Sequence, residues 1–477
     1  VPELLARKDF VLKRMNDLGF ITTEEYADAK EQELSFKKSA EKIVAPHFVV
    51  MAKEYLSSKY GEGVAESGGF KVITTLDANL QALAEEVVEK YAKINKERYK
   101  ASNAAMVSID PKNGDLLALV GSADYFDIEN EGNFNVATAK RQPGSAFKPF
   151  AYAAALQKGY TDFTVLFDLK TEFNYNCSPD ALQEKDKFGI DCYHPKNYDG
   201  LYRGPVTLRQ ALSQSLNVPS VKTLYLAGVE DTIDMAENLG ITTLGDRERF
   251  GLSLVLGGAE VKLVDITSAY GVFAADGMRS PWSFIQKVES SNGLVLEEKE
   301  NEPKRILDTQ IARMINNILS DNSARAPVFG YSSSLYVAGR DVAAKTGTTQ
   351  ENRDAWVIGY SPNLVTGVWT GNNRQESMTQ QGAGISAAGP MWHEFMAKAL
   401  ESYPYERFVS PSPLSGNKPM LDGNYIYTKD GTSGSEYHSI LFFVNRNDPK
   451  GPFPSDPSKD LQFNNWEWSV QNIFAPR

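Results

Sequence analysis

The run Val342-Ala343-Ala344-Lys345-Thr346-Gly347-Thr348 has strand-forming character and ends in a Lys-Thr-Gly-Thr tetrad. A cation, a hydroxyl group and a glycine at a strand edge make a good receptor for a carboxylate. The glycine lets a substrate backbone approach closely, and the free edge can pair with a peptide as an added strand. The alternative is an ordinary edge strand that a lysine protects from aggregation. The tetrad alone leaves both interpretations open.

Further strand signals lie on both sides of this run in the sequence. The runs Ala104–Asp110 and Asp115–Val120 flank Asn113-Gly114, a strong hairpin signal, and Ala355–Tyr360 and Val365–Trp369 follow the tetrad. Between the two groups of strands lie helical patterns at 145–158, 207–226, 230–239, 261–275 and 308–320. Two strands, then helices, then three strands predict an α+β domain in which helices pack on an antiparallel sheet.

The chain divides into four predicted parts. Residues 1–45 form a charged helical lead-in, residues 46–96 a linker region, and residues 97–400 the main domain. Residues 401–477 are rich in Pro, Ser, Gly, Asn and Asp, and are predicted to form a small β-rich appendage or tail. Its two strand candidates are Tyr425–Thr428 and Ile440–Val444.

Composition excludes several classes of function. The 477 residues carry a net charge of −11 and the pI is about 5.2, which disfavours nucleic-acid binding. Only four histidines and two cysteines are present, and they are dispersed, so neither a metal site nor a cofactor is predicted. We therefore expect acid–base chemistry to use groups other than imidazole, although a Ser-His-Asp hydrolase remains possible on residue count alone. Cys177 and Cys192 could form a disulfide in an oxidising compartment or remain free thiols.

The first partner of a Lys-Thr-Gly strand is a Ser-x-x-Lys motif. Of the four occurrences, which begin at Ser35, Ser39, Ser145 and Ser415, the context favours Ser145. It follows a turn at 141–144 and opens an apolar helical run, which puts Lys148 one turn along the same face. The helix N-terminus and Lys345 would both disfavour a charged Lys148, and a neutral Lys148 can accept the Ser145 proton. The alternative is a capping serine beside a solvated lysine.

Two groups of backbone donors complete this hypothesis. The first-turn N–H groups after Ser145, with the N–H of Thr348, could form an oxyanion hole.

The second partner motif, Ser-x-Asn, begins at Ser215, Ser290, Ser320, Ser361 and Ser415. We favour Ser215 with Asn217, where a helix breaks before Pro219 and exposes polar side chains. Ser320 with Asn322 is more simply explained as the end of the helix 308–320.

With these three motifs in order, the chain resembles the class A penicillin-binding proteins, which are high-molecular-weight peptidoglycan synthases. The resemblance extends from Phe70 to Trp392. Besides the three motifs it rests on Thr74–Asp77, Arg141–Phe150, Asn197-Tyr198, Gly204–Arg209, Leu256–Glu260 and Arg353–Trp356. It implies the fold shared by penicillin-binding proteins and serine β-lactamases, with a five-stranded antiparallel sheet and helices on both faces. Two features depart from the family pattern: Lys262 stands where a hydroxyl residue is usual, and segment 171–193 matches no family motif.

The resemblance also implies the activity and the roles of residues. The function would be a D,D-transpeptidase that cross-links stem peptides through an acyl-enzyme on Ser145, with Lys148 as its base and Ser215 as proton relay. β-Lactams would acylate the same serine. The substrate-binding residues would be Asn217, Lys345, Thr346, Gly347 and Thr348.

The same family suggests partners, location and alternatives. Residues 1–35 resemble the end of a glycosyltransferase domain whose catalytic carboxylates are missing, so no glycosyltransferase activity is expected. The expected partners are stem peptides, glycan strands, β-lactams and cell-wall synthesis proteins. The expected location is extracytoplasmic, with an N-terminal membrane anchor in the full-length protein. A carboxypeptidase or β-lactamase of the same fold, or a non-catalytic penicillin-binding sensor, remains an alternative, although no carboxylate base for β-lactam hydrolysis is evident.

Overall fold

The computed structural model describes residues 2–32, 43–428 and 436–474, and it divides into the units Val1–Val44 and Ala45–Arg477. The first unit contains the helices α1 (Pro2–Asp17) and α2 (Thr23–Glu31). Thr22 is the N-cap of α2 and forms a reciprocal capping box with Glu25. In the ranges described, no helix is long and apolar enough to cross a membrane.

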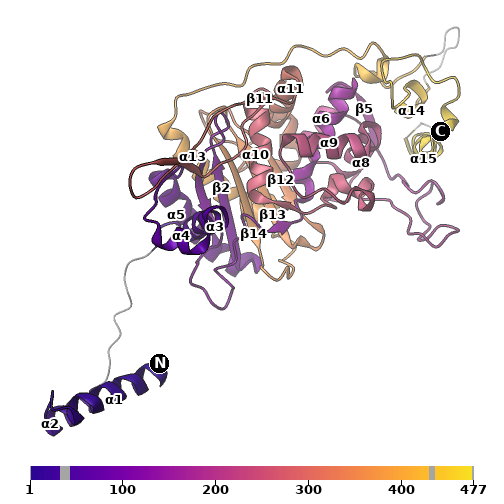
Figure 1. Ribbon diagram of the computed structural model, residues 1–477. Helices are drawn as coiled ribbons and strands as arrows, with labels where there is room; N and C mark the ends of the chain where they lie inside the picture. The colour runs from indigo at the N-terminus through magenta and orange to yellow at the C-terminus, as the bar shows by residue number, and fades with distance from the viewer. Residues whose placement is uncertain (1, 33–42, 429–435, 475–477) are drawn as a thin grey trace. The chain divides into compact units, whose positions relative to one another are not determined.

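The second unit is built around a five-stranded antiparallel sheet (Figure 1). Its strands are β2 (Asn103–Ile109), β3 (Leu116–Val120), β12 (Ala343–Thr348), β13 (Asp354–Tyr360) and β14 (Val365–Gly371). They lie in the order β12-β13-β14-β2-β3, and each neighbouring pair is antiparallel. The prediction of a five-stranded antiparallel sheet is therefore confirmed. The strand order places β12, the strand of the Lys-Thr-Gly-Thr tetrad, at an edge of the sheet.

Helices cover both faces of this sheet. Side chains of a strand alternate between faces, and in β2 Ala104 and Met106 face one core while Ala105 and Val107 face the other. The first core is shared with α5 (Ala78–Tyr99) and α13 (Gly389–Ala399), and the second with α10 (Leu263–Ala274) and α11 (Thr309–Ser320). A sheet that is apolar on both faces needs such a covering layer on each side.

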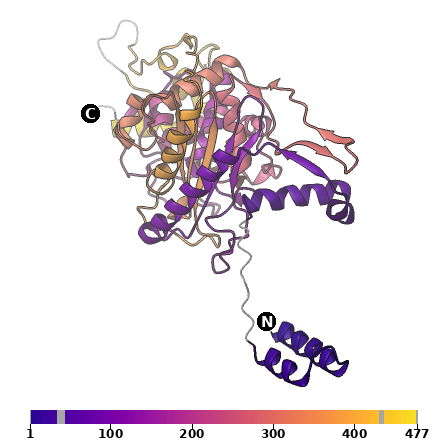
Figure 2. The ribbon, with the colours of Figure 1, turned by 90° about the vertical axis from the view of Figure 1, so that its left-hand side faces the viewer.

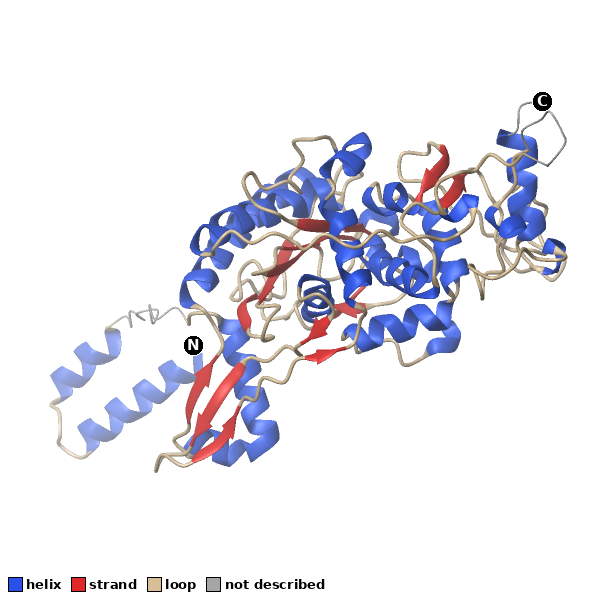
Figure 3. Ribbon diagram, turned by 90° about the horizontal axis from the view of Figure 1, so that it is seen from above, coloured by secondary structure: helices blue, strands red, loops and turns tan. Residues whose placement is uncertain are grey.

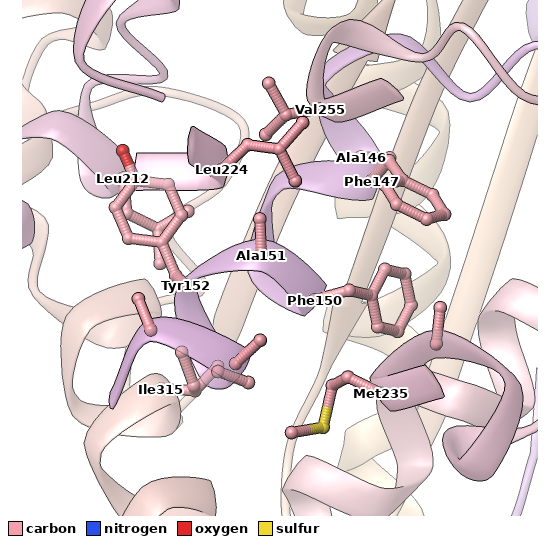
Figure 4. Close-up of a cluster of buried hydrophobic side chains, with 14 of the residues drawn as sticks. Ala146, Phe147, Phe150, Ala151, Tyr152, Leu212, Leu224, Met235, Val255 and Ile315 are labelled. Carbon is pink, nitrogen blue, oxygen red and sulfur yellow. The ribbon is translucent and has the colours of Figure 1, made fainter. Parts of the chain in front are cut away.

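A helical layer continues the second core beyond the sheet. It contains α6 (Lys148–Lys158), α7 (Leu208–Ser213), α8 (Asn217–Ala227) and α9 (Val229–Leu239). Every residue of α6 from Lys148 to Leu156 is buried, and Figure 4 shows its side chains among those of the neighbouring helices. Helix α6 is thus the centre of this layer, so Lys148 begins a helix that is packed from every side.

A smaller sheet stands beside the main one. Strand β1 (Lys71–Thr74) pairs with β9 (Ile285–Glu289), which pairs in turn with β10 (Val295–Glu298), all antiparallel. These three strands stand out from the rest of the unit (Figure 2 and Figure 3). Helix α3 (Pro46–Tyr60) is joined to them by a hydrogen bond of 2.6 Å from the Tyr55 hydroxyl to the Glu297 carboxylate. Helix α4 (Glu62–Ser67) then leads into β1.

Short antiparallel strand pairs of two or four residues lie outside the two larger sheets. Strand β4 (Lys140–Arg141) pairs with β7 (Val261–Lys262), so Lys262 lies opposite Lys140; nothing in the structure explains the lysine at this position. Strand β5 (Val165–Asp168) pairs with β6 (Gly204–Thr207). The pair β8 (Met278–Arg279) with β11 (Lys304–Arg305) and the helix α12 (Asn322–Phe329) complete the unit up to the appendage.

The C-terminal residues 403–428 and 436–474 form an extended segment with short helices, which we call the C-terminal strap. The expectation of a β-rich appendage is wrong. The segment after α13 crosses the top of the view in Figure 1 and reaches α14 (Ile440–Phe443) and α15 (Phe463–Ser469). The predicted strand at Ile440–Val444 is one helical turn that buries Ile440, Leu441 and Phe443, and Tyr427 forms only an isolated bridge to Glu436. A five-residue apolar run has no periodicity that separates a strand from a turn of helix.

Candidate active site

Ser145 lies on a short turn that is pressed against the edge strand β12. The turn is a 3₁₀ helix, Gly144–Phe147, and α6 begins only at Lys148, so the expected α-helix starts three residues later than predicted. Gly144 has φ 54°, and a Cβ atom there would lie 2.4 Å from the Thr348 carbonyl oxygen. A Cβ on Gly347 would lie 2.2 Å from the Pro143 carbonyl oxygen. Two glycines therefore permit the contact between the serine turn and the tetrad strand.

Hydrogen bonds from buried aromatic residues fix the same turn. The indole N–H of Trp356, on β13, donates to the Gln142 carbonyl at 2.8 Å, and the Tyr270 hydroxyl, on α10, donates to the Ala146 carbonyl at 2.6 Å. Both side chains are fully buried. The turn is thus held from the sheet and from a covering helix, which orders the backbone on either side of Ser145.

The Ser145 side chain opens into a cleft of about 580 Å³. In the part of the chain that the structure describes, its hydroxyl group has no hydrogen-bond partner. Four other residues of the predicted motifs line the cleft: Ser215, Asn217, Thr346 and Thr348. The hydroxyl group of Ser145 is therefore directed to a space in which a substrate can lie.

Lys148 is completely buried beneath this cleft. Its Nζ donates to the Ser215 carbonyl at 2.7 Å, the Leu216 carbonyl at 3.1 Å and the Asn217 Oδ1 at 2.9 Å. Burial lowers the pKa of Lys148 well below its usual value, and the charge of Lys345 lowers it further. The sequence anticipated the second cause but not the first, because burial depends on tertiary packing. A lysine with a lowered pKa can serve as a general base near neutral pH.

Ser215 joins two lysines. Its Oγ lies 2.7 Å from the Nζ of Lys345 and 3.4 Å from the Nζ of Lys148. The residue has φ 59°, in the left-handed region, at the break between α7 and α8. Such a conformation costs a non-glycine residue on the order of 1–2 kcal/mol, and strain of this kind is concentrated at functional sites. The strained turn aims the Ser215 hydroxyl between the two amines.

Lys345 faces Ser215 from beneath the cleft. It is 2% exposed and also donates to the carbonyl of Thr346 at 2.9 Å. Burial, with a smaller effect of the Arg325 charge, lowers the pKa of Lys345 to about 7. The residues of the tetrad that line the cleft are Thr346 and Thr348. The Oγ1 of Thr348 accepts a hydrogen bond of 3.0 Å from the backbone N–H of Gly384. The tetrad therefore offers hydroxyl groups to the cleft and a buried amine behind them.

The competing Ser-x-Asn motif lies elsewhere. Ser320 is the last residue of α11, and Asn322 begins α12, where its Nδ2 donates to the Tyr331 carbonyl at 2.9 Å. Asp321 caps α12 between them, with its side chain accepting from the N–H of Ala324. Neither Ser320 nor Asn322 lines the cleft. Their structural role is to end one helix and begin the next, as the sequence indicates for the first.

One wall of the cleft comes from residues that sequence reasoning did not assign. Cys177 and Cys192 form a disulfide, which resolves the two alternatives that the sequence left open. The residues that follow it, Cys192–Lys196 and Tyr198, line the cleft. Glu172 accepts from the N–H of Tyr193 at 2.7 Å and contacts His194 Nδ1 at 2.9 Å. The disulfide engages both sulfur atoms near Glu172, so this cluster is not a metal site.

The C-terminal strap braces this wall. From α15 and the residue before it, Gln462 Nε2 donates to the Phe173 carbonyl at 2.6 Å, and the side chain of Ser469 donates to the Lys170 carbonyl at 2.8 Å. Between them Asn465 Nδ2 donates to the Glu172 carbonyl at 3.2 Å. The C-terminal strap thus supports the segment that precedes Cys177 through these hydrogen bonds.

The sequence matches known families over the part that carries this site. Residues 104–397 match the model of the penicillin-binding protein transpeptidase domain. Penicillin-binding protein 1A of Aquifex aeolicus is 32% identical, over 85% of this chain and 64% of its own length. Penicillin-binding protein 2D of Bacillus subtilis is 30% identical, over 95% of this chain and 64% of its own length. The chain therefore spans a little under two thirds of these relatives.

Solved structures show the same architecture. The PonA1 protein of Mycobacterium tuberculosis in complex with penicillin V aligns with a TM-score of 0.64 and 29% identity, over 78% of this chain and 97% of that chain. Penicillin-binding protein 1A of Haemophilus influenzae aligns with a TM-score of 0.67 over 91% of this chain and 81% of that chain; at 22% identity it shows the fold alone. With the domain match over residues 104–397, these likenesses show that the chain belongs to the penicillin-binding protein transpeptidase family.

Proposed function

We propose that the chain is a serine-type D,D-transpeptidase that cross-links peptidoglycan stem peptides through an acyl-enzyme on Ser145. The observation that carries the proposal is the set of contacts around Ser215. Its hydroxyl group lies 2.7 Å from the Nζ of Lys345, and its backbone carbonyl lies 2.7 Å from the Nζ of Lys148. Lys148 follows Ser145 by three positions in the chain. A nucleophile, a buried amine and a hydroxyl bridge are groups with which a serine can carry out acyl transfer without a histidine as the base.

In the acylation step the neutral amine of Lys148 accepts the proton of Ser145. The Ser145 Oγ then bonds to the carbonyl carbon of the penultimate D-alanine of a stem peptide. The oxyanion that forms is stabilised by backbone N–H groups of the serine turn and of Thr348. As the peptide bond breaks, the proton passes through the Ser215 hydroxyl to the leaving amine of the terminal D-alanine. The products are an ester on Ser145 and free D-alanine.

In the second step an amine of a neighbouring stem peptide attacks this ester. The amine loses a proton to the Lys148–Ser215 pair, the Ser145 Oγ leaves and regains its proton, and a new amide bond joins the two peptides. Asn217 would hold the substrate amide, while Thr346 and Thr348, with Lys345 behind them, would bind the terminal carboxylate. A β-lactam would enter by the first step, because attack of Ser145 on its ring carbonyl opens the ring and leaves an ester.

The location and partners follow from the same proposal. A disulfide in the cleft wall favours an oxidising, extracytoplasmic compartment, where peptidoglycan is assembled. The proposed partners are glycan strands and other cell-wall synthesis proteins, and the proposed location is the outer face of the cytoplasmic membrane. The net charge of −11 disfavours nucleic acid as a partner.

A donor–acceptor assay tests the proposed reaction. The protein is incubated with a soluble peptide ending in D-Ala-D-Ala, with and without a D-amino acid as acceptor amine. Transpeptidation predicts that the acceptor is incorporated in place of the terminal residue. Release of the terminal residue with water as the only acceptor would instead identify a carboxypeptidase, and no turnover with an intact Ser145 adduct would identify a sensor.

A further inference from the structure

A buried carboxylate close to the active site has no part in the mechanism above. Asp168 ends β5 and is completely buried. Its Oδ1 and Oδ2 accept hydrogen bonds of 2.9 and 2.8 Å from the Nδ2 of Asn197, and Oδ2 also accepts from the N–H of Arg203 at 3.0 Å. A carboxylate is rarely buried away from water unless hydrogen bonds or opposite charges compensate for its desolvation.

The carboxylate fixes which way the amide of Asn197 points. An ionised carboxylate can only accept hydrogen bonds, so the NH₂ group of Asn197 must face Asp168. The Oδ1 of Asn197 then faces the opposite way, where it accepts from the backbone N–H of Asn217 at 2.7 Å and of Val218 at 3.4 Å. The orientation of this amide therefore follows from the chemistry of its partners.

The two N–H groups that donate to the Oδ1 of Asn197 belong to the first turn of α8. The residue before this helix, Leu216, has no capping side chain, so the cap is supplied by Asn197, twenty positions before Asn217. Helices that begin without a cap fray in their first turn. Here the first turn carries Asn217, and it directly follows the strained Ser215.

The side chain of Asn217 connects this cap to the proposed base. Its Oδ1 accepts from Lys148 Nζ at 2.9 Å, and its Nδ2 donates to the carbonyl of Lys196 at 2.8 Å, next to Asn197 in the chain. Asn197 thus contacts the backbone of Asn217 while its neighbour contacts the side chain. A change at Asn197 would reach Lys148 through a single residue.

We infer that Asn197 and Asp168 are positioning residues for acylation: Asp168 orients the amide of Asn197, and this amide caps α8 and so holds Ser215 and Asn217 against Lys148. The inference rests on the proposed function for its chemistry. Neither residue lines the cleft, and Asn197 acts on the reaction through the α7–α8 turn.

Asp168 also contributes its charge. It opposes the lowering of the Lys148 pKa, because a buried negative charge favours the ammonium form. Burial raises the pKa of Asp168 itself, while its hydrogen bonds and the neighbouring cations lower it. The titratable and charged groups that interact with it are Lys148, Tyr152, Tyr202, Arg203 and Lys222.

Asn197→Ala tests the cap. With the folded fraction checked by circular dichroism, the first-order acylation rate by a fluorescent penicillin should fall roughly 10- to 100-fold, as expected for a small misplacement of catalytic groups. Asn316→Ala is the matched control, because Asn316 is a buried asparagine that donates to the Phe273 carbonyl at 2.8 Å and lies outside the site. It should lose stability but keep the acylation rate of the unaltered chain.

Asp168→Asn tests the charge. Removal of a negative charge lowers the pKa of Lys148 further, so the rise of the acylation rate with pH should move to lower pH. A purely structural role would lower the rate without moving the profile. An unchanged rate in Asn197→Ala, or an unshifted profile in Asp168→Asn, overturns the inference. If the unaltered chain forms no adduct on Ser145, the proposed function fails instead, so the two failures are distinguishable.

Discussion

Replacing Gly144 with alanine should displace the serine turn from the tetrad strand. The new Cβ would lie 2.4 Å from the Thr348 carbonyl oxygen, and ordinary contact begins at 3.4 Å. The turn and the strand must then separate by 3.4 − 2.4 = 1.0 Å, because the opposing atom is backbone and cannot rotate away. A misplacement of about 1 Å can reduce the rate of an enzymatic step roughly 100-fold. We therefore expect acylation of Gly144→Ala to be slower by about that factor.

The assay is the first-order rate of labelling by a fluorescent penicillin, measured on protein whose folded fraction is known. Gly159→Ala is the matched control. Gly159 also has a positive φ, 116°, but its nearest neighbour is the flexible side chain of Lys450 at 3.4 Å. It should lose about 1 kcal/mol of stability from backbone strain and keep its acylation rate. Labelling of Gly144→Ala at the rate of the unaltered chain would refute the argument that close packing aligns Ser145.

Three further predictions concern the lysine pair, the choice of motif and the disulfide. Ser215→Ala should slow acylation, while Ser320→Ala leaves the acylation rate unaltered. The reverse result in the same labelling assay would show that Ser320 and Asn322, and not Ser215 and Asn217, form the functional Ser-x-Asn motif. Lys345→Met removes a charge that lowers the pKa of Lys148, so the rise of the acylation rate with pH should move to higher pH; a shift to lower pH would contradict the assigned interaction. Replacing both Cys177 and Cys192 with serine opens a loop with a sequence separation of 15 residues. This should cost about 3 kcal/mol of unfolding free energy in urea titrations, and an unchanged midpoint would contradict it.

The sheet could be predicted from the sequence because its signals are local. Asn113-Gly114 marks a hairpin, and β13 and β14 are apolar runs bounded by turns. The failure at Ile440–Val444 has the opposite cause: the run is too short for its period to be read, and its packing against the body of the protein decides that it is helical.

The motifs of the site could likewise be found, but not the way in which they cooperate. Spacing places Lys148 one turn after Ser145, yet its complete burial and the 2.7 Å contact of Ser215 with Lys345 depend on three segments far apart in the chain. The left-handed conformation of Ser215 has no local signal, since serine shows no preference for it. The cap from Asn197 is equally invisible in sequence, because it joins residues twenty positions apart.

The most direct measurement is the intact mass of the protein after treatment with penicillin, followed by peptide mapping. We expect a single adduct with the mass of the whole antibiotic, stable over the experiment and located on the peptide that contains Ser145. Ser145→Ala should carry no adduct. An adduct on any other residue, or an undiminished adduct on Ser145→Ala, would contradict the assignment of Ser145 as the nucleophile.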